Sequence, residues 1–261
     1  MTSQKRRTAL VTGGTKGIGL ETVRALAGAG TRVFLCARDK DAVAATVSGL
    51  RDEGLDVAGG PCDVREPNEV AGLVEAAVER FGALDVLVNN AGRSGGGVTA
   101  EVSDELWFDV IATNLHSVFL VTREVLRASG MRERGFGRIV NVASTAGKQG
   151  VVLGAPYSAS KHGVVGLTKA LGNELAPTGI TVNAVCPGYV ETPMAQGVRA
   201  GYAAHWGISE AEVLSRFQAK IPLGRYSTPG EVAAMIAYLT TDAAASITSQ
   251  AINVCGGLGN Y

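Results

Sequence analysis

Short apolar runs rich in β-branched residues alternate with longer stretches of helical periodicity from one end of this chain to the other. Apolar strands separated by helices are typical of a parallel sheet buried on both faces, because parallel neighbours require crossover connections. The alternation predicts an α/β fold with a doubly wound parallel sheet. No Pro-, Ser- or Gly-rich linker, charge block or internal repeat divides the 261 residues, so we expect one domain over 1–261.

The boundaries of these elements follow from the same pattern. Strands are expected at Ala9–Val11, Arg32–Ala37, Val57–Cys62, Val86–Val88, Arg138–Val142, Thr181–Val185 and Ala251–Val254. Helices are expected at Ile18–Ala29, Lys40–Glu53, Glu66–Phe81, Asp104–Ser129, Tyr157–Ala176 and Pro229–Leu239. Residues 188–220 interrupt this alternation, because strand-to-helix connections usually have about 2 to 6 residues and this one is much longer. Their aromatic side chains favour a lid over a disordered loop.

Composition excludes several classes of protein. The chain has 24 basic and 24 acidic side chains, and a formal net charge of zero argues against a nucleic-acid-binding protein. No apolar stretch approaches the ~20 residues that span a bilayer, and the N-terminal apolar run is too short for a secretory signal. We therefore expect no membrane partner and a cytoplasmic location. The four cysteines and three histidines show no metal-ligand spacing, so no metal site is expected.

A glycine-rich segment lies between the first expected strand and the first expected helix. Glycines at such a turn let the backbone approach a pyrophosphate, and the helix N-terminus offers unpaired N–H groups and the positive end of a dipole. In a chain with 35 glycines the spacing alone is weak, and an ordinary tight turn is the alternative. The expected cofactor contacts in this segment are Thr12, Gly13, Thr15, Lys16, Gly17, Ile18 and Gly19.

The end of the second strand bears on the choice between NAD and NADPH. An acidic residue there would bind the ribose 2′-hydroxyl of NAD. Ala37 stands where this acid is expected, and Arg38 can bind a 2′-phosphate with Lys16 nearby. NADPH is therefore the favoured cofactor. A shifted register would instead place the Asp39 carboxylate at the ribose, and Arg38 would then be a surface charge.

Short polar residues also follow the third and fourth strands. Asp63 can accept from an adenine amino group while the backbone near Val64 meets the ring, and Asn90, Ala91 and Gly92 can line the adenosine cleft. Either segment alone could be an ordinary Asx turn. Both lie at carboxyl ends of strands, where open α/β sheets bind ligands, and this favours cofactor contacts.

Four residues form a candidate catalytic group. Tyr157 and Lys161 are four residues apart on an expected helix, Ser144 ends the fifth strand, and Asn114 precedes that strand. In carbonyl reduction the developing alkoxide needs a hydrogen-bond donor and a source of a proton. Tyr157 can supply the proton, and the charge of Lys161 should lower the tyrosine pKa from its usual ~10. Ser144 can donate to the carbonyl oxygen. Lys161 can also hold the nicotinamide ribose, and Asn114 can position Lys161 through a water.

Over essentially its whole length the chain resembles the short-chain dehydrogenase/reductase family. The segments TGGTKGIG, NNAG and YSASK, with Asn114, Ser144 and the Pro187–Gly188 turn, follow the family's order. The resemblance implies a Rossmann domain with seven parallel strands, a catalytic tetrad of Asn114, Ser144, Tyr157 and Lys161, and commonly a homotetramer. It also implies cofactor contacts at Tyr157, Lys161, Pro187, Gly188, Val190 and Thr192.

Three segments show a narrower resemblance, to the ketoreductases of aromatic (type II) polyketide synthases: residues 90–97, 144–152 and 253–261. It implies NADPH-dependent reduction of one ketone, often at C9, of a polyketide tethered to an acyl carrier protein. Ser94 stands where that family usually has proline. The expected substrate contacts are Ser94, Gly95, Gly96, Thr145, Gln149, Val151, Met194, Tyr202 and Trp206.

Three arginines match positions that this family presents to the carrier protein or its phosphopantetheine arm: Arg38, Arg65 and Arg93. Arg38 is assigned mainly to the cofactor, and a solvated surface is the alternative for the other two. A 3-oxoacyl-[acyl-carrier-protein] reductase of fatty-acid synthesis is the alternative enzyme. A cofactor-sensing binding protein is the alternative from another class, which the complete tetrad disfavours.

Overall fold

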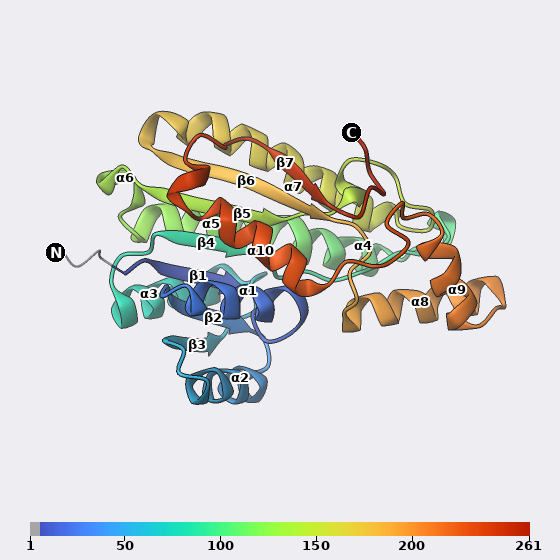
Figure 1. The fold of residues 1–261 in the computed structure, drawn as a ribbon, viewed down its shortest axis with the longest axis horizontal. Coiled ribbons are helices and arrows are strands. Elements are labelled where there is room, and N and C mark those ends of the chain that lie inside the picture. Colours follow the sequence, from blue (N-terminus) through green and yellow to red (C-terminus); the bar gives the residue numbers. More distant parts are fainter. Residues whose placement is uncertain (1–5) are drawn as a thin grey trace.

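The structure is a computed structural model that describes residues 6–261. This part of the chain is organised around one parallel sheet. Its strand order is β3-β2-β1-β4-β5-β6-β7, which confirms the predicted doubly wound fold (Figure 1). The strands are β1 (Thr8–Thr12), β2 (Arg32–Ala37), β3 (Val57–Pro61), β4 (Val86–Asn89), β5 (Gly137–Val142), β6 (Ile180–Pro187) and β7 (Ala251–Val254). All neighbouring pairs in the sheet are parallel.

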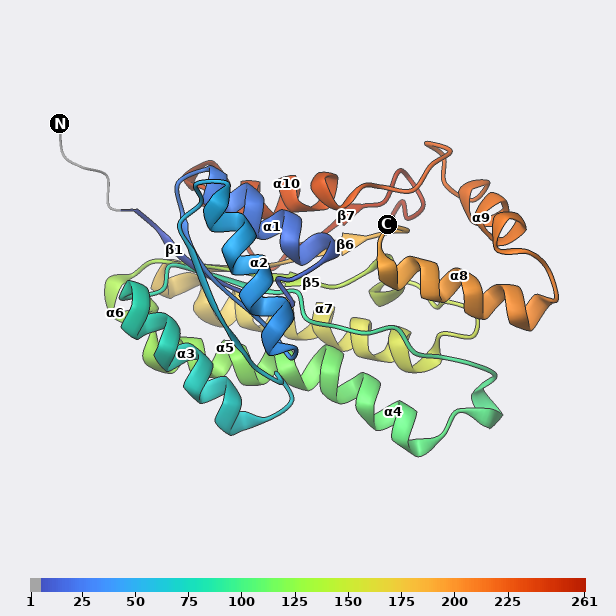
Figure 2. The ribbon, with the colours of Figure 1, turned by 90° about the horizontal axis from the view of Figure 1, so that it is seen from below.

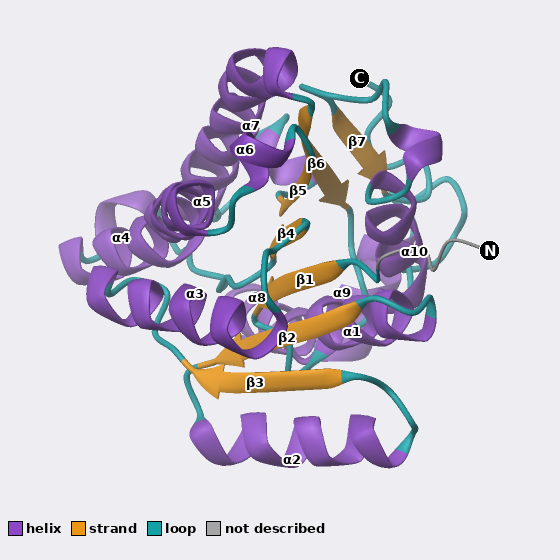
Figure 3. Cartoon of the chain, turned by 90° about the vertical axis from the view of Figure 1, so that its left-hand side faces the viewer, coloured by secondary structure: helices purple, strands orange, loops and turns teal. Residues whose placement is uncertain are grey.

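Helices cover both faces of the sheet, as the end-on view in Figure 3 shows. One face packs against α1 (Gly17–Gly28), α2 (Lys40–Asp52) and α10 (Pro229–Leu239). The other packs against α3 (Pro67–Phe81), α5 (Ser117–Ala128) and α7 (Ala155–Leu175). Successive strand residues point to opposite faces, so Leu10 packs on the second side while Ala9 and Val11 pack on the first. The central strands therefore need apolar residues at every position.

The helix expected over Asp104–Ser129 is interrupted. The structure has α4 (Asp104–Ile111), a π-helical turn at Ala112–His116, and then α5. A π-turn inserts an extra residue into the helix and is frequent at functional sites. Asn114 lies within this turn.

Residues 188–220 form helices rather than an open loop. They contain α8 (Pro193–Trp206) and α9 (Glu210–Gln218), which project beyond the carboxyl ends of the strands (Figure 2). Tyr202 and Trp206 pack with Phe217 and Tyr189 in a separate small core. The aromatic residues therefore hold these two helices together.

The remaining helices are short. They are α6 (Met131–Arg134) and the 3-10 turns at Thr99–Glu101, Thr145–Gly147, Ala176–Thr178 and Asp242–Ala244. Within residues 6–261, no helix is long and apolar enough to cross a membrane. The same part of the chain contains no cluster of three or more His, Cys, Asp or Glu residues suited to hold a metal ion.

Candidate active site

The turn between β1 and α1 depends on glycine at three positions. Gly13 and Gly17 have left-handed backbones, with φ of 66° and 56°. A Cβ on Gly19 would overlap the carbonyl oxygen of Gly13. Lys16 occupies the N-cap of α1 without a side-chain cap, and no acidic residue lies in the first turn. The first amides of α1 are therefore available to an anion, and this geometry fits the pyrophosphate of a dinucleotide.

Asn90 joins this turn to the end of β4. The backbone amides of Asn90 and Ala91 both donate to Thr12 Oγ1 at 3.0 Å. Asn90 Nδ2 donates to the carbonyl oxygens of Thr12 and Gly13 at 2.9 and 3.0 Å. The strand order reverses between β1 and β4, and open α/β sheets bind ligands at this point.

Asp39 has a structural role that its sequence position left open. Its Oδ1 accepts from the amides of Asp41 and Ala42 at 2.9 and 3.0 Å and so caps α2. Arg38 is exposed at the end of β2, close enough to Asp63 to help lower the pKa of that carboxyl. The larger cause of the lowered Asp63 pKa is Arg65, whose Nη2 donates to Asp63 Oδ2 at 2.6 Å. Asp39 is thus engaged as a helix cap, whereas Arg38 forms no ion pair with any residue among 6–261.

Asn114 is held by partners on two elements. Its Oδ1 accepts from the Arg93 amide at 2.8 Å, and its Nδ2 donates to the Arg93 carbonyl at 3.0 Å and to Ser160 Oγ at 3.1 Å. Gly92 packs beside it, where a Cβ would lie 3.2 Å from Asn114 Oδ1 and 3.8 Å from Lys161 Nζ. The π-turn thus brings Asn114 next to the YSASK helix, α7.

The structure brings Ser144, Tyr157 and Lys161 together. Ser144 is close enough to Tyr157 to influence its pKa, and its Oγ accepts from the Ala146 amide at 3.0 Å and donates to the Pro187 carbonyl at 3.5 Å. Lys161 Nζ donates to the Val142 carbonyl at 2.8 Å and lies 5.7 Å from the centre of the Tyr157 ring. A Cβ on Gly147 would overlap the backbone of Lys161, so glycine there lets the Ser144 loop pack on α7.

Burial controls the protonation of this pair. Burial lowers the pKa of Lys161 to about 8. Burial also raises the pKa of Tyr157 above its usual value, and the hydrogen bond from Ser144 only partly opposes this. The expected lowering of the Tyr157 pKa by Lys161 is therefore not found here. The physical reason is that Lys161 directs its Nζ to a carbonyl and is itself penalised by burial as a cation.

The predicted nicotinamide segment adjoins the glycine turn. Thr192 caps α8 by accepting from the Ala195 amide at 3.3 Å, and a Cβ on Gly17 would lie 3.3 Å from Thr192 Cγ2. Gly188 lies against Cys255, and the neighbouring Pro187 and Val190 are buried. The loop after β6 is thus packed between the glycine turn and the end of β7.

The predicted substrate contacts come from three neighbouring segments. A Cβ on Gly96 would overlap the Leu153 carbonyl, which accepts from the Gly97 amide at 2.8 Å. Tyr202 Oη donates to the Val152 carbonyl, so α8 is attached to the same loop. The other residues are placed as follows: Ser94, Gly95, Gln149, Val151 and Trp206 are partly buried, Thr145 is buried, and Met194 is 42% exposed.

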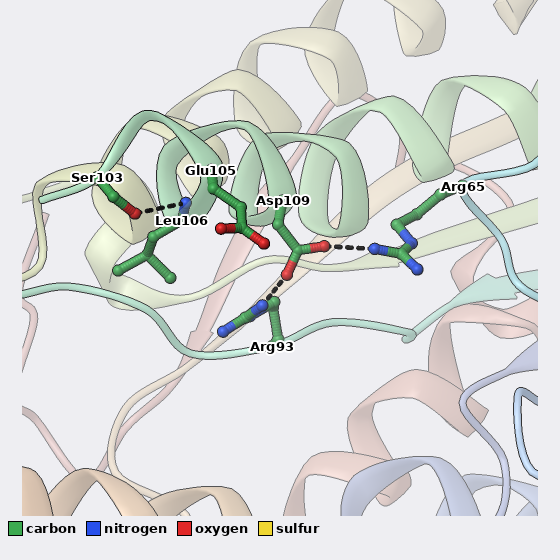
Figure 4. A pocket seen from close by; sticks show the side chains of 6 residues that line it. All are labelled: Arg65, Arg93, Ser103, Glu105, Leu106 and Asp109. Carbon is green, nitrogen blue, oxygen red and sulfur yellow. Dashed lines mark hydrogen bonds and ion pairs between the residues drawn. The ribbon is translucent and has the colours of Figure 1, made fainter.

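Two residues that the sequence analysis missed stabilise this region. Ser160 orients Asn114, as described above, and its place inside YSASK was the available signal. Asp109 lies on α4 between Arg65 and Arg93 and pairs with both (Figure 4). Sequence spacing carries no signal for Asp109, because its two partners come from loops after other strands.

Comparisons with known proteins agree with this geometry. A family model described as short chain dehydrogenase matches residues 7–203, and the chain belongs to this family. A ketoacyl reductase of the monensin polyketide synthase from Streptomyces virginiae is 69% identical over 100% of both chains.

A crystal structure of a variant of the actinorhodin polyketide ketoreductase with NADPH superimposes with a TM-score of 0.96, at 61% identity and 100% coverage of both chains. A 3-oxoacyl-[acyl-carrier-protein] reductase from Synechocystis is 40% identical over 99% of both chains. The predicted family and fold are therefore confirmed.

Proposed function

We propose that this protein is an NADPH-dependent ketoreductase that reduces one ketone of a polyketide bound to an acyl carrier protein. The observation that carries the proposal is the group formed by Ser144, Tyr157 and Lys161 beside the glycine turn. The polyketide synthase reductases at 61 to 69% identity support the polyketide substrate. The 3-oxoacyl reductase of fatty-acid synthesis, at 40% identity, is the weaker alternative.

The residues for cofactor binding would divide between the two halves of NADPH. The amides at the start of α1 would bind the pyrophosphate, Arg38 and Lys16 the 2′-phosphate, and Asp63 with Val64 the adenine. The segments 90–92 and 187–192 would enclose the adenosine and the nicotinamide. When bound there, NADPH supplies a hydride from C4 of its nicotinamide ring.

The chain's own side chains would complete the reduction. Tyr157 Oη donates a proton to the ketone oxygen as the carbonyl carbon gains its new C–H bond, so that an alcohol forms. Ser144 Oγ donates a hydrogen bond to the same oxygen and stabilises the negative charge that develops there. Lys161 lies beside Tyr157 and can return the proton, because its pKa of about 8 is close to neutral pH. Asn114 would position Lys161 through a water.

A carrier-bound chain would enter between the loops 94–97 and 150–154 and the lid, residues 188–220. Gly96, Tyr202 and Trp206 would border this entrance, and Arg65 and Arg93 pair with Asp109 on α4. Guanidinium groups suit the phosphate of a phosphopantetheine arm. We expect reduction of the C9 type from the resemblance described above.

The assembly and location belong to the same proposal. Phe108 is 67% exposed on α4 and Phe119 is 47% exposed on α5, with Trp107 nearby at 39%. Large apolar side chains gathered on two consecutive helices are suited to an interface. We propose that they are covered in a homotetramer and that the enzyme works in the cytoplasm.

NADPH oxidation with a bicyclic ketone, such as a decalone, tests the function directly. A polyketide reductase should use this ketone with a higher kcat/KM than a short linear 3-oxoacyl thioester. The reverse preference would favour the fatty-acid reductase, and no oxidation with any ketone would favour a binding protein. Product analysis after co-expression with a minimal polyketide synthase would then identify the carbon reduced.

A further inference from the structure

We propose that Asp109 competes with the phosphate of the carrier arm for Arg93, and thereby limits how tightly the arm binds. The inference rests on the proposed function, because it assumes that Arg93 meets this phosphate. Asp109 stands between the two arginines (Figure 4). Its Oδ1 accepts from Arg65 Nη1 at 2.5 Å, and its Oδ2 pairs with Arg93 Nη1.

Charge around these residues is balanced rather than basic. The cavity of about 460 Å³ at this position is lined by Arg65 and Arg93 and by the carboxylates of Glu105 and Asp109. Asp63 is a third carboxylate in this region, and Arg65 Nε donates to its Oδ1 at 2.9 Å. A phosphate therefore meets Arg65 or Arg93 without a competing carboxylate only if that arginine leaves its acidic partner.

Arg93 is the arginine that can exchange partners. Its side chain is 41% exposed and its acidic partner is Asp109 alone, whereas Arg65 is 34% exposed and is held by Asp63 as well. Exposed ion pairs are weak, and a phosphate offers an arginine the same two-pronged geometry as a carboxylate. The exchange would break one weak pair and form another.

The backbone of Arg93 need not move during this exchange. Asn114 bonds both the amide and the carbonyl of Arg93, at 2.8 and 3.0 Å. The guanidinium has to rotate from Asp109 toward the phosphate, and its Nε, which donates to the Ser94 carbonyl at 3.0 Å, has to keep or release that bond as it turns. The competition is therefore local to the side chain and is separable from the positioning of Asn114.

Calorimetric titration of the NADP⁺-loaded enzyme with 4′-phosphopantetheine and with pantetheine isolates the phosphate. The measured quantity is the Kd of pantetheine divided by that of 4′-phosphopantetheine. Asp109→Asn should raise this ratio about threefold to fivefold, because the competing charge is removed while the side-chain shape is kept. Asp109→Ala should change it in the same direction, and added salt should reduce the gain.

Glu105→Gln is the matched control. It removes an equal charge from the same cavity, and Glu105 forms no ion pair with either arginine in the described structure. We expect a smaller rise in the ratio than with Asp109→Asn. An equal rise would overturn the proposal in favour of a general field effect, and a fall with Asp109→Asn would show that Asp109 instead positions the arginines for the phosphate.

A double variant tests the assignment to Arg93. In an Arg93→Gln background, Asp109→Asn should not raise the ratio of the two Kd values. A rise that persists there would overturn the assignment to Arg93. Decalone reduction is measured in parallel on the wild-type protein. Absence of that activity would count against the proposed function, whereas normal activity with an unaltered Kd ratio in Asp109→Asn would count against this inference alone.

Discussion

At the scale of single residues, burial determines how the proposed catalytic side chains are protonated. Lys161 is 5% exposed and has a pKa of about 8, while burial keeps the Tyr157 pKa above its ordinary value. Tyr157 is therefore a protonated donor at neutral pH. This state suits a residue that must give a proton during reduction.

Removing the phenol tests this role. Tyr157→Phe should lower kcat about 10²- to 10⁴-fold, because the substitution deletes the proton donor and leaves the ring in place. NADPH binding, followed by cofactor fluorescence, should be retained. Substantial residual turnover with a decalone would contradict the assignment.

The lowered pKa of Lys161 also predicts how stability depends on pH. The unfolded chain holds this proton up to a pKa near 10.5 and the folded chain only to about 8, so the unfolded state binds more protons between these values. The free-energy cost of burying the charged Lys161 is therefore fully present below pH 8. It falls as the pH rises above 8, so the folded state becomes more stable.

Lys161→Met removes this penalty. Denaturant unfolding of both proteins should show that the free energy of unfolding of the wild type, relative to that of the variant, rises by about 2 kcal/mol between pH 7 and pH 9.5. A constant difference in the free energy of unfolding across this range would show that the folded-state pKa is not lowered.

At the scale of elements, α1 and the interrupted α4–α5 helix position the site. The glycine turn opens the N-terminus of α1, and the π-turn inserts Asn114 between Arg93 and Ser160. Both features are local departures from regular structure at the carboxyl edge of the sheet. A regular helix in place of the π-turn would turn Asn114 elsewhere.

Two glycines in α1 provide a matched comparison. Gly19→Ala should destabilise the protein and abolish NADPH binding, because the added Cβ would overlap the Gly13 carbonyl. Gly28→Ala has open space around the added Cβ and should raise the free energy of unfolding by up to about 1 kcal/mol. Unfolding curves and NADPH titrations of both variants check this, and equal effects would refute the steric argument.

At the scale of the whole molecule, the exposed aromatic residues of α4 and α5 lie on the same side of the sheet as α3 and α7 (Figure 3). Burial of such a surface between subunits would leave the carboxyl edge of each sheet open to substrate. The proposed assembly is thus compatible with four separate sites.

Charged substitutions on this surface test the assembly. Phe108→Glu combined with Phe119→Glu should dissociate the tetramer, because carboxylates would be buried without partners. Sedimentation velocity measures the result, with Leu223→Glu, at a position 67% exposed on another part of the surface, as the control. An unchanged sedimentation coefficient in the double variant would show that the interface lies elsewhere.

The sequence by itself determined the sheet and its order of elements, and it supplied most residues of the candidate site. Continuous apolar strands require cover on both faces, and the glycine turn and the Tyr157–Lys161 spacing are local patterns that survive in the linear chain. Tertiary structure alone decided the rest. The Asp109 pairing, the Asn114 contacts and the direction of the Tyr157 pKa depend on groups far apart in sequence, whose burial and separation exist only after the chain has folded.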